Sequence, residues 1–168
     1  MGTSPEKKIG KGMLIISWIL LLIALTFIFG KWEDDQYNPN HTINQDIPGE
    51  VVLQQNRQNH YVASGLINGH PVIFLLDTGA TDVAVPTAIA QKIGLKPGRK
   101  NQAMTANGIV QTRNTQIDSL QLGTIRLSNV RASINPGMQG PEILLGMSAL
   151  KDLELIQRAS TLTIRQLN

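Results

Sequence analysis

The sequence of 168 residues contains no cysteine. Disulfide bonds, thiol catalysis and cysteine-based zinc sites are therefore excluded. Aromatic residues are also scarce, at 4% of the chain, and beyond residue 50 only Tyr61 and Phe74 supply them. The net charge of +3 comes from basic residues scattered through the second half without a dense run. A chain with few stacking side chains and no basic cluster is a poor nucleic-acid binder, so no nucleic-acid partner is expected.

Motifs for metal-dependent, nucleotide-dependent or serine-based chemistry are missing as well. The three histidines, His41, His60 and His70, lie in turn-like or linker-like contexts without ligand spacing. No His-Glu-x-x-His, phosphate-binding loop or Gly-x-Ser-x-Gly pattern occurs. Ser148 follows a glycine and a methionine but has no accompanying signature. The sequence therefore predicts neither a metal site nor a cofactor, and a serine hydrolase is not favoured.

One long hydrophobic run stands out near the N-terminus. Residues 12–30 contain no charged side chain, and as a helix they would span about 28 Å, close to the hydrocarbon core of a bilayer. A cleaved signal peptide or a buried helix are the alternatives. Signal peptides have shorter apolar cores, and Lys31–Asp35 is a poor cleavage context. The run therefore predicts a transmembrane helix. Because Lys7, Lys8 and Lys11 precede it, the N-terminus is expected in the cytoplasm.

After residue 49 the pattern is mostly β. Asn68-Gly69 and Asn107-Gly108 are hairpin signals. Pro86 precedes a predicted helix at 87–93, and a second short helix is expected at 147–150. Strands are predicted at 51–53, 61–67, 72–76, 115–122, 125–134, 153–158 and 161–167. Many short strands separated by Gly and Asn favour an all-β fold, a closed or partly closed barrel with one or two short helices.

Two apolar strands end in motifs that suggest chemistry. The run Val72–Leu76 leads directly into Asp77, Thr78, Gly79 and Ala80. A strand that ends in a carboxylate holds that group rigidly, a hydroxyl can fix nearby backbone, and a glycine lets another chain approach. The second strand, Ile143-Leu144-Leu145, ends in Gly146. The simpler alternative is a turn at the end of a strand, capped by the Asp77 carboxylate.

Together these motifs resemble those of the retropepsin-like aspartic proteases, over roughly residues 50–168. The closer likeness is to bacterial membrane-anchored members, which share a single N-terminal span and the text Asp-Thr-Gly-Ala-Thr-Asp of residues 77–82. The resemblance implies a single-lobed closed β-barrel, here preceded by a single transmembrane helix. It divides the chain into a cytoplasmic segment (1–11), a transmembrane helix (12–30), a linker (31–49) and a protease domain (50–168).

The resemblance also implies roles for individual residues. Asp77 would be catalytic, with Thr78, Gly79 and Ala80 supporting the active-site loop. The hairpin around Asn107-Gly108 would cover the substrate, although a plain surface hairpin is the alternative. The substrate-binding residues implied in this way are Asp82, Val83, Asn107, Gly108, Ile109 and Leu145.

Aspartic proteases need two neighbouring carboxylates, and this chain has one Asp-Thr-Gly. Asp82, Asp118 and Asp152 lack that context, so the second carboxylate would come from a second copy. The expected protein is a homodimeric aspartic endopeptidase, a single-pass protein of the inner (cytoplasmic) membrane with its protease domain periplasmic or otherwise extracytoplasmic. Its expected partners are a peptide or protein substrate, a second copy and membrane lipid. A catalytically silent dimerisation or peptide-binding module, or an envelope structural protein, would be the rival.

Two departures from retroviral enzymes are visible in the sequence. Many of those enzymes carry Asp at the position of Thr81 and Arg at the position of Met147, and the two residues form an ion pair. Both charged residues are absent here, so neither is left without its partner. We therefore interpret the two differences as one paired change. Dimer geometry and specificity therefore cannot be transferred from those enzymes.

Overall fold

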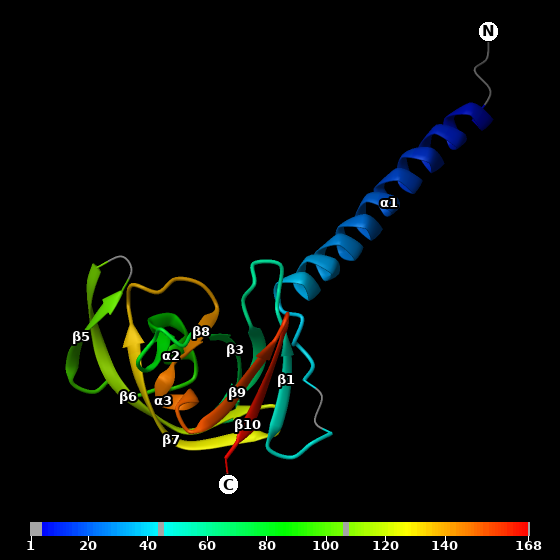
Figure 1. Ribbon diagram of the computed structural model, residues 1–168. Coiled ribbons are helices and arrows are strands. Elements are labelled where there is room, and N and C mark those ends of the chain that lie inside the picture. Colours follow the sequence, from blue (N-terminus) through cyan, green and yellow to red (C-terminus); the bar gives the residue numbers. More distant parts are fainter. Residues whose placement is uncertain (1–4, 44–45, 106–107, 168) are drawn as a thin grey trace. The chain divides into compact units, whose positions relative to one another are not determined.

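The computed structural model describes residues 5–43, 46–105 and 108–167. The chain separates into two compact units, one up to Tyr37 and one from Asn38 onward. Each unit is described by itself below, with the elements labelled as in Figure 1.

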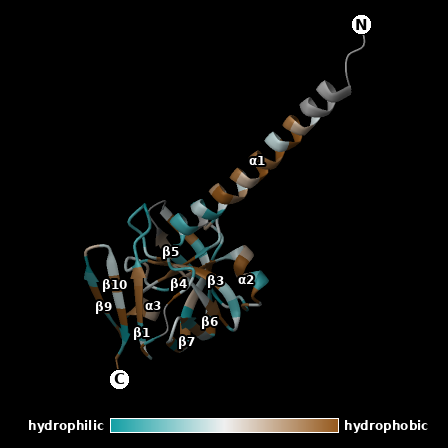
Figure 2. Cartoon of the chain, turned by 90° about the vertical axis from the view of Figure 1, so that its right-hand side faces the viewer, coloured by the Kyte–Doolittle hydropathy of each residue, from teal (hydrophilic) through white to brown (hydrophobic). Residues whose placement is uncertain are grey.

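The first unit is one helix, α1 (Pro5–Tyr37). Its large apolar side chains between Met13 and Phe29 are exposed on all sides, and Figure 2 shows the hydrophobic colour along its middle. A helix that is apolar all round is normally buried in protein or in lipid. From Gly12 to Tyr37 it is long and apolar enough to cross a membrane, a test that a signal sequence near an N-terminus also passes. The helix extends beyond the predicted end at residue 30.

The second unit is built almost entirely of short strands, as predicted. Two short helices interrupt them, α2 (Thr87–Lys92) and α3 (Met147–Leu150), close to the predicted positions. The strands are β1 (Glu50–Gln54), β2 (Val62–Ile67), β3 (His70–Leu76), β4 (Val83–Pro86), β5 (Lys100–Thr105), β6 (Gly108–Leu122), β7 (Ile125–Asn135), β8 (Glu142–Leu145), β9 (Leu153–Arg158) and β10 (Thr161–Gln166).

Seven of these strands form one sheet in the order β2-β3-β8-β4-β7-β6-β5. An additional pairing of β2 with β6, at Leu66↔Gln121 and Ile67↔Leu120, joins the sheet back on itself. Six strands therefore close into a ring, and β5 extends from it beside β6 (Figure 1). Inside lies an apolar core that includes Phe74, Ile117 and Ile143, all fully buried. The predicted barrel-like all-β fold is thus confirmed.

The hairpin between β2 and β3 shows how local sequence produces this topology. Asn68 (φ 49°) and Gly69 (φ 81°) both adopt positive φ angles. Consecutive positive φ angles are typical of the type I′ turn, whose twist matches that of paired strands. The turn sets the register Val62↔Leu75 and Ile67↔His70, so β3 runs through the core and ends at Leu76, directly before Asp77.

Two elements differ from the prediction. Strand β4 (Val83–Pro86) was not expected, since its four residues are too few to show a period, yet all four are buried. Strand β6 runs unbroken from Gly108 to Leu122, whereas the sequence predicted a strand only at 115–122. Its polar middle pairs with β7 from Arg113↔Ile134 onward, so tertiary pairing compensates for a weak local pattern.

Residues 38–43 of the predicted linker pack with the strands. The Asn40 side chain donates to the carbonyls of Gln54 (2.9 Å) and Val62 (2.7 Å) and accepts from the Gln54 N–H (2.7 Å). Asn38 donates to the Ser64 hydroxyl at 3.0 Å. Both asparagines are buried, and buried amides need such partners. The compact unit consequently begins at Asn38.

A smaller sheet, in the order β1-β10-β9, completes the unit. Between β10 and β1, Arg165 Nε lies 2.6 Å from the Glu50 carboxylate. This hydrogen bond raises the pKa of the Arg165 guanidinium, with the charge of Glu50 acting in the same direction. The contact is exposed to solvent on the Arg165 side, so it contributes little to stability.

Candidate active site

Asp77 lies directly after β3, where the strand leaves the core. Its N–H donates to the carbonyl of Leu145 at 3.2 Å, and β3 runs parallel to β8 with Leu76 opposite Leu145. The carboxyl ends of parallel strands meet at the same edge of a sheet. The two motifs recognised in the sequence, more than sixty residues apart, are therefore neighbours.

The loop after Asp77 orients the carboxylate. Asp77 Oδ1 accepts a hydrogen bond from the Gly79 N–H at 2.9 Å, and the Ala80 N–H donates to the Asp77 carbonyl at 3.2 Å. Asp77 itself is half-buried, whereas Thr78 and Gly79 are exposed. The carboxylate is thus held by its own turn and remains open to solvent. The simpler alternative, a turn capped by Asp77, has the same local geometry.

The second motif supports the Asp77 loop through backbone contacts. The N–H groups of Met147 and Ser148, at the start of α3, donate to the carbonyls of Ala80 (2.8 Å) and Thr81 (2.9 Å). A Cβ atom on Gly146 would lie against the carbonyl oxygen of Asp82 and 2.7 Å from that of Ala80. Only glycine permits so close an approach of two backbones, which explains why β8 ends in this residue.

Ser148 has a structural role that the sequence did not reveal. Its hydroxyl accepts a hydrogen bond from the Val83 N–H at 2.9 Å and donates to the Arg131 carbonyl at 2.7 Å. One side chain thereby connects the active-site loop, α3 and β7. From the sequence, Ser148 is a candidate only for a nucleophile. The motif Gly-Met-Ser gives no sign of contacts with Arg131 and Val83, which lie 17 and 65 positions away in the chain.

Asp82 forms an ion pair that was also not foreseen. Arg131 Nε lies 2.6 Å from Asp82 Oδ1, with the Asp82 side chain 20% exposed and that of Arg131 66% exposed. The expected role of Asp82 was to line a substrate subsite, and its carboxylate is committed in part to Arg131. The sequence lacks the Asp and Arg that form an ion pair in retroviral enzymes. Asp82, one position after Thr81, instead forms an ion pair with Arg131 on β7.

Val83 and Leu145, two of the residues expected to bind substrate, have buried side chains. Val83 is 0% exposed and Leu145 1% exposed, and both belong to the core. Their part in substrate binding stays a prediction. Leu145 contributes its carbonyl, which accepts the Asp77 N–H.

The predicted flap corresponds to the hairpin of β5 and β6. Ile109 is 67% exposed and lies opposite Met104, which is 86% exposed. Gly108 begins β6 with φ 105°, while Asn107 lies outside the described residues. The structure thus shows an exposed apolar end on this hairpin, and its contact with substrate remains a prediction. Within the described ranges no three His, Cys, Asp or Glu side chains gather as a metal site would require.

Comparison with known proteins identifies the family. Residues 63–152, which include both Asp77 and Gly146, match the family model described as "gag-polyprotein putative aspartyl protease". The chain belongs to this family. The match favours the aspartic protease interpretation over a plain capped turn, because it covers the Asp77 loop and β8 together.

The chain is also similar to two curated proteins and to one solved structure, and the solved structure supports the same assignment. An uncharacterized protein in the cobV 5' region of Sinorhizobium sp is 30% identical over 175 residues, covering 94% of this chain and 75% of the relative. The uncharacterized protein RP867 of Rickettsia prowazekii is 29% identical over 107 residues, covering 61% of this chain and 45% of that protein. The crystal structure of a retropepsin-like aspartic protease from Rickettsia conorii matches with a TM-score of 0.60 and 28% identity, covering 70% of this chain and 91% of the other. The predicted retropepsin-like fold is therefore confirmed.

Proposed function

We propose that this protein is a membrane-anchored aspartic endopeptidase that acts as a homodimer, with Asp77 of each subunit in one catalytic site. The observation that carries the proposal is the position of Asp77. It is a half-buried carboxylate at the end of β3, oriented by the Gly79 N–H, in a loop supported by β8 and α3. Membership of an aspartic protease family makes peptide hydrolysis the activity that fits this geometry.

The chemistry requires a pair of carboxylates that share one proton. The ionised partner accepts a proton from water, and the protonated partner donates to the carbonyl oxygen of the scissile bond. Two carboxylates about 3 Å apart do not both ionise easily, so one proton is retained between them. Water attacks the carbonyl carbon, and collapse of the tetrahedral intermediate releases the two peptide fragments.

A second copy of the chain is the best source of the second carboxylate. Asp77 is the only Asp in an Asp-Thr-Gly context. The nearby Asp82 carboxylate is paired with Arg131 instead. Thr78 and Gly79 are exposed, so these residues are available for contact across a dimer axis and with a substrate chain. The alternative, a silent module on the same fold, would retain the loop but not the reaction.

The substrate is proposed to be a peptide or protein segment held between the Asp77 loop and the β5–β6 hairpin. Gly79 leaves room for an extended backbone, and Ile109 with Asn107 and Gly108 would cover it. Main-chain hydrogen bonds to an extended peptide give affinity with little dependence on sequence. Ala80 and Asp82 would border the subsites, with Asp82 fixed in position by Arg131.

The membrane anchor is proposed to be α1. Its apolar stretch is followed by a compact unit that begins at Asn38. The lysines at positions 7, 8 and 11 favour a cytoplasmic N-terminus, which would place the protease unit outside the cytoplasm. Two chains tethered in one membrane have a raised effective concentration, which favours dimerisation.

The deciding experiment is Asp77→Asn in the full chain, reconstituted in lipid nanodiscs and incubated with a peptide library. The amide preserves shape but cannot supply the shared proton, so cleavage should be abolished while the thermal unfolding curve is unchanged. Asp118→Asn is the matched control, because this exposed aspartate lacks the motif and should leave cleavage intact. Peptidase activity retained by a folded Asp77→Asn protein would exclude the aspartic mechanism.

Dimer dependence is tested separately by mixing wild type with the Asp77→Asn variant at equal amounts before reconstitution. If each site needs two Asp77 residues and subunits exchange freely, activity falls to about one quarter. Independent monomeric sites would leave one half. This result would reject the homodimer while keeping the protease assignment.

A further inference from the structure

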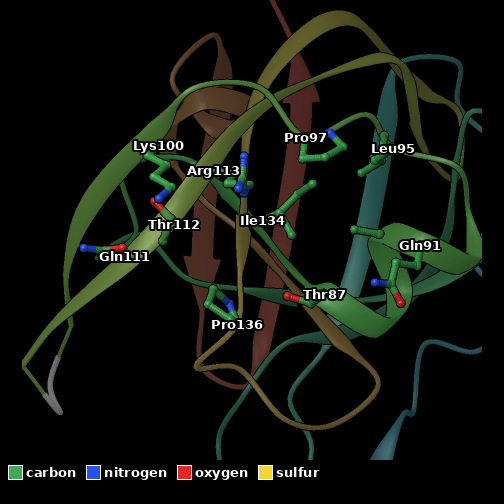
Figure 3. A pocket seen from close by; sticks show the side chains of 11 residues that line it. Thr87, Gln91, Leu95, Pro97, Lys100, Gln111, Thr112, Arg113, Ile134 and Pro136 are labelled. Carbon is green, nitrogen blue, oxygen red and sulfur yellow. The ribbon is translucent and has the colours of Figure 1, made fainter.

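A cavity of about 430 Å³ lies beside the base of the β5–β6 hairpin and is not lined by Asp77. Its walls come from α2, the segment after α2, the two hairpin strands and the end of β7 (Figure 3). A volume of this size falls within the range of roughly 300–1,000 Å³ found for small-molecule sites. The chemistry of the lining therefore decides what it could bind.

Two cations face each other at the hairpin side of the cavity. Lys100 on β5 is the direct cross-strand partner of Arg113 on β6, and both line the cavity. Like charges directly opposite on paired strands are unfavourable. Neither side chain has an ion pair with a carboxylate among the described residues, and no acidic residue lines the cavity. Arg113 makes one long contact, from Nη1 to the Gly98 carbonyl at 3.5 Å.

A hydroxyl also lines the cavity. Thr112, next to Arg113 in the sequence, is 2% exposed and belongs to the same lining. Its side chain offers a hydrogen-bond donor to a ligand oxygen in the cavity.

The opposite wall combines apolar side chains with the polar side chains of Thr87 and Gln91 on α2. Ala90 on α2, Leu95 after it and Ile134 on β7 are all buried core residues that reach the cavity, together with Pro97 and Pro136. Figure 3 shows Leu95 and Pro97 on the side away from Lys100, with Arg113 and Ile134 between them. The cavity thus has an apolar end and a cationic end.

We propose that this cavity binds a small aliphatic carboxylate, with its chain against Ala90, Leu95 and Ile134 and its carboxylate between Lys100 and Arg113. A guanidinium matches a carboxylate through paired hydrogen bonds, and the Thr112 hydroxyl can donate to the same group. The bound anion would also relieve the repulsion between the two cations. This site lies beyond the proposed peptidase function and does not depend on it.

The test uses the full chain in nanodiscs with hexanoate as probe, followed by NMR of the labelled methyl groups of Ala90, Thr112 and Ile134. Hexanoate should shift these signals in a saturable manner and leave Ile164, in the smaller sheet, unchanged. Hexan-1-ol and hexylamine carry the same chain without the anion and should bind at least about tenfold more weakly. Hexyl phosphate tests the head group, and tighter binding than hexanoate would overturn the carboxylate assignment.

Variants locate the site. The double change Lys100→Gln and Arg113→Gln affects two exposed side chains, so the fold should persist, and hexanoate affinity should fall about tenfold or more. Thr112→Val removes only the hydroxyl and should weaken binding by a smaller factor. Arg126→Gln, an exposed base outside the cavity, is the matched control and should bind as wild type. Equal binding by wild type and the double variant, or by hexanoate and hexan-1-ol, would overturn the proposal.

Discussion

The Asp77 loop and the end of the β5–β6 hairpin differ in how they are held. The loop is connected to β8, α3 and β7 by backbone hydrogen bonds and by the Ser148 hydroxyl. At the hairpin end, Met104 on β5 and Ile109 on β6 are largely exposed. They lie opposite each other, and each pairs only with the other strand of the hairpin. One region is therefore constrained by residues far away in the sequence, and the other by local pairing alone.

This difference corresponds to two tasks in the proposed mechanism. A catalytic carboxylate needs an orientation that does not vary, which distant contacts provide. A segment that covers different peptides benefits from adaptable apolar side chains and few tertiary contacts, because such regions open at low cost in free energy. Substitutions at the contacts that hold the loop in place should therefore reduce stability and activity together, while substitutions in the hairpin should affect activity alone.

Gly146→Ala should produce the largest effect. The new Cβ would collide with the carbonyls of Asp82 and Ala80, and both are backbone atoms that cannot move without displacing the loop. We expect a loss of about 3 kcal/mol in the free energy of unfolding and loss of peptidase activity, measured by thermal denaturation and a peptide-cleavage assay.

Gly79→Ala provides the matched control for that change. Its Cβ would meet only the Asp77 carboxylate oxygen at 3.2 Å, so stability should change by less than about 1 kcal/mol. Activity should still fall, because the methyl group occupies the space proposed for the substrate backbone. Equal destabilisation by the two variants would show that the loop is not held against Gly146.

Ser148→Ala should have the next largest effect. Without the hydroxyl, the Val83 N–H and the Arg131 carbonyl each lose a partner, which should cost about 1–3 kcal/mol of stability. Ser128→Ala, an exposed serine on β7, should change the midpoint of denaturation very little. If both variants unfold at the same temperature, the Ser148 contacts do not stabilise the loop.

Met104→Ser combined with Ile109→Ser tests the hairpin. Both side chains are exposed, so the free energy of unfolding should stay within about 0.5 kcal/mol of wild type. The KM for peptides should rise several-fold with a smaller change in kcat, since uniform binding of substrate is lost. A large drop in stability would indicate that these side chains pack against the protein instead.

The smallest effects on stability are expected at two ion pairs of equal length. Arg131 contacts Asp82 and Arg165 contacts Glu50, each at 2.6 Å through Nε. Because both arginines are exposed, Arg131→Gln and Arg165→Gln should each lower the midpoint of thermal unfolding very little. Only Arg131→Gln should raise KM, since Asp82 borders the active-site loop. An equal effect of both changes on KM would exclude a specific role for the Asp82–Arg131 pair.

Local sequence determined much of this protein. The uncharged run at 12–30 is a long apolar helix because every face of it is hydrophobic, and Asn68-Gly69 forms a tight turn because both residues tolerate positive φ angles. Asp77 follows a β-branched and aromatic strand and was recognised from that context. Such features depend on neighbours within a few residues, and a linear pattern displays them directly.

Tertiary structure alone decided the contacts around the loop. Val83 is buried because β4 lies between β7 and β8 and both of its faces are covered, and Leu145 is buried because β8 lies between β3 and β4 and turns this side chain to the core. No pattern of four residues can reveal such a position. The pairing of Arg131 with Asp82 and the bonds of Ser148 join segments 17 to 65 residues apart. They arise from strand register, and register is set by the packing of the whole core rather than by any single segment.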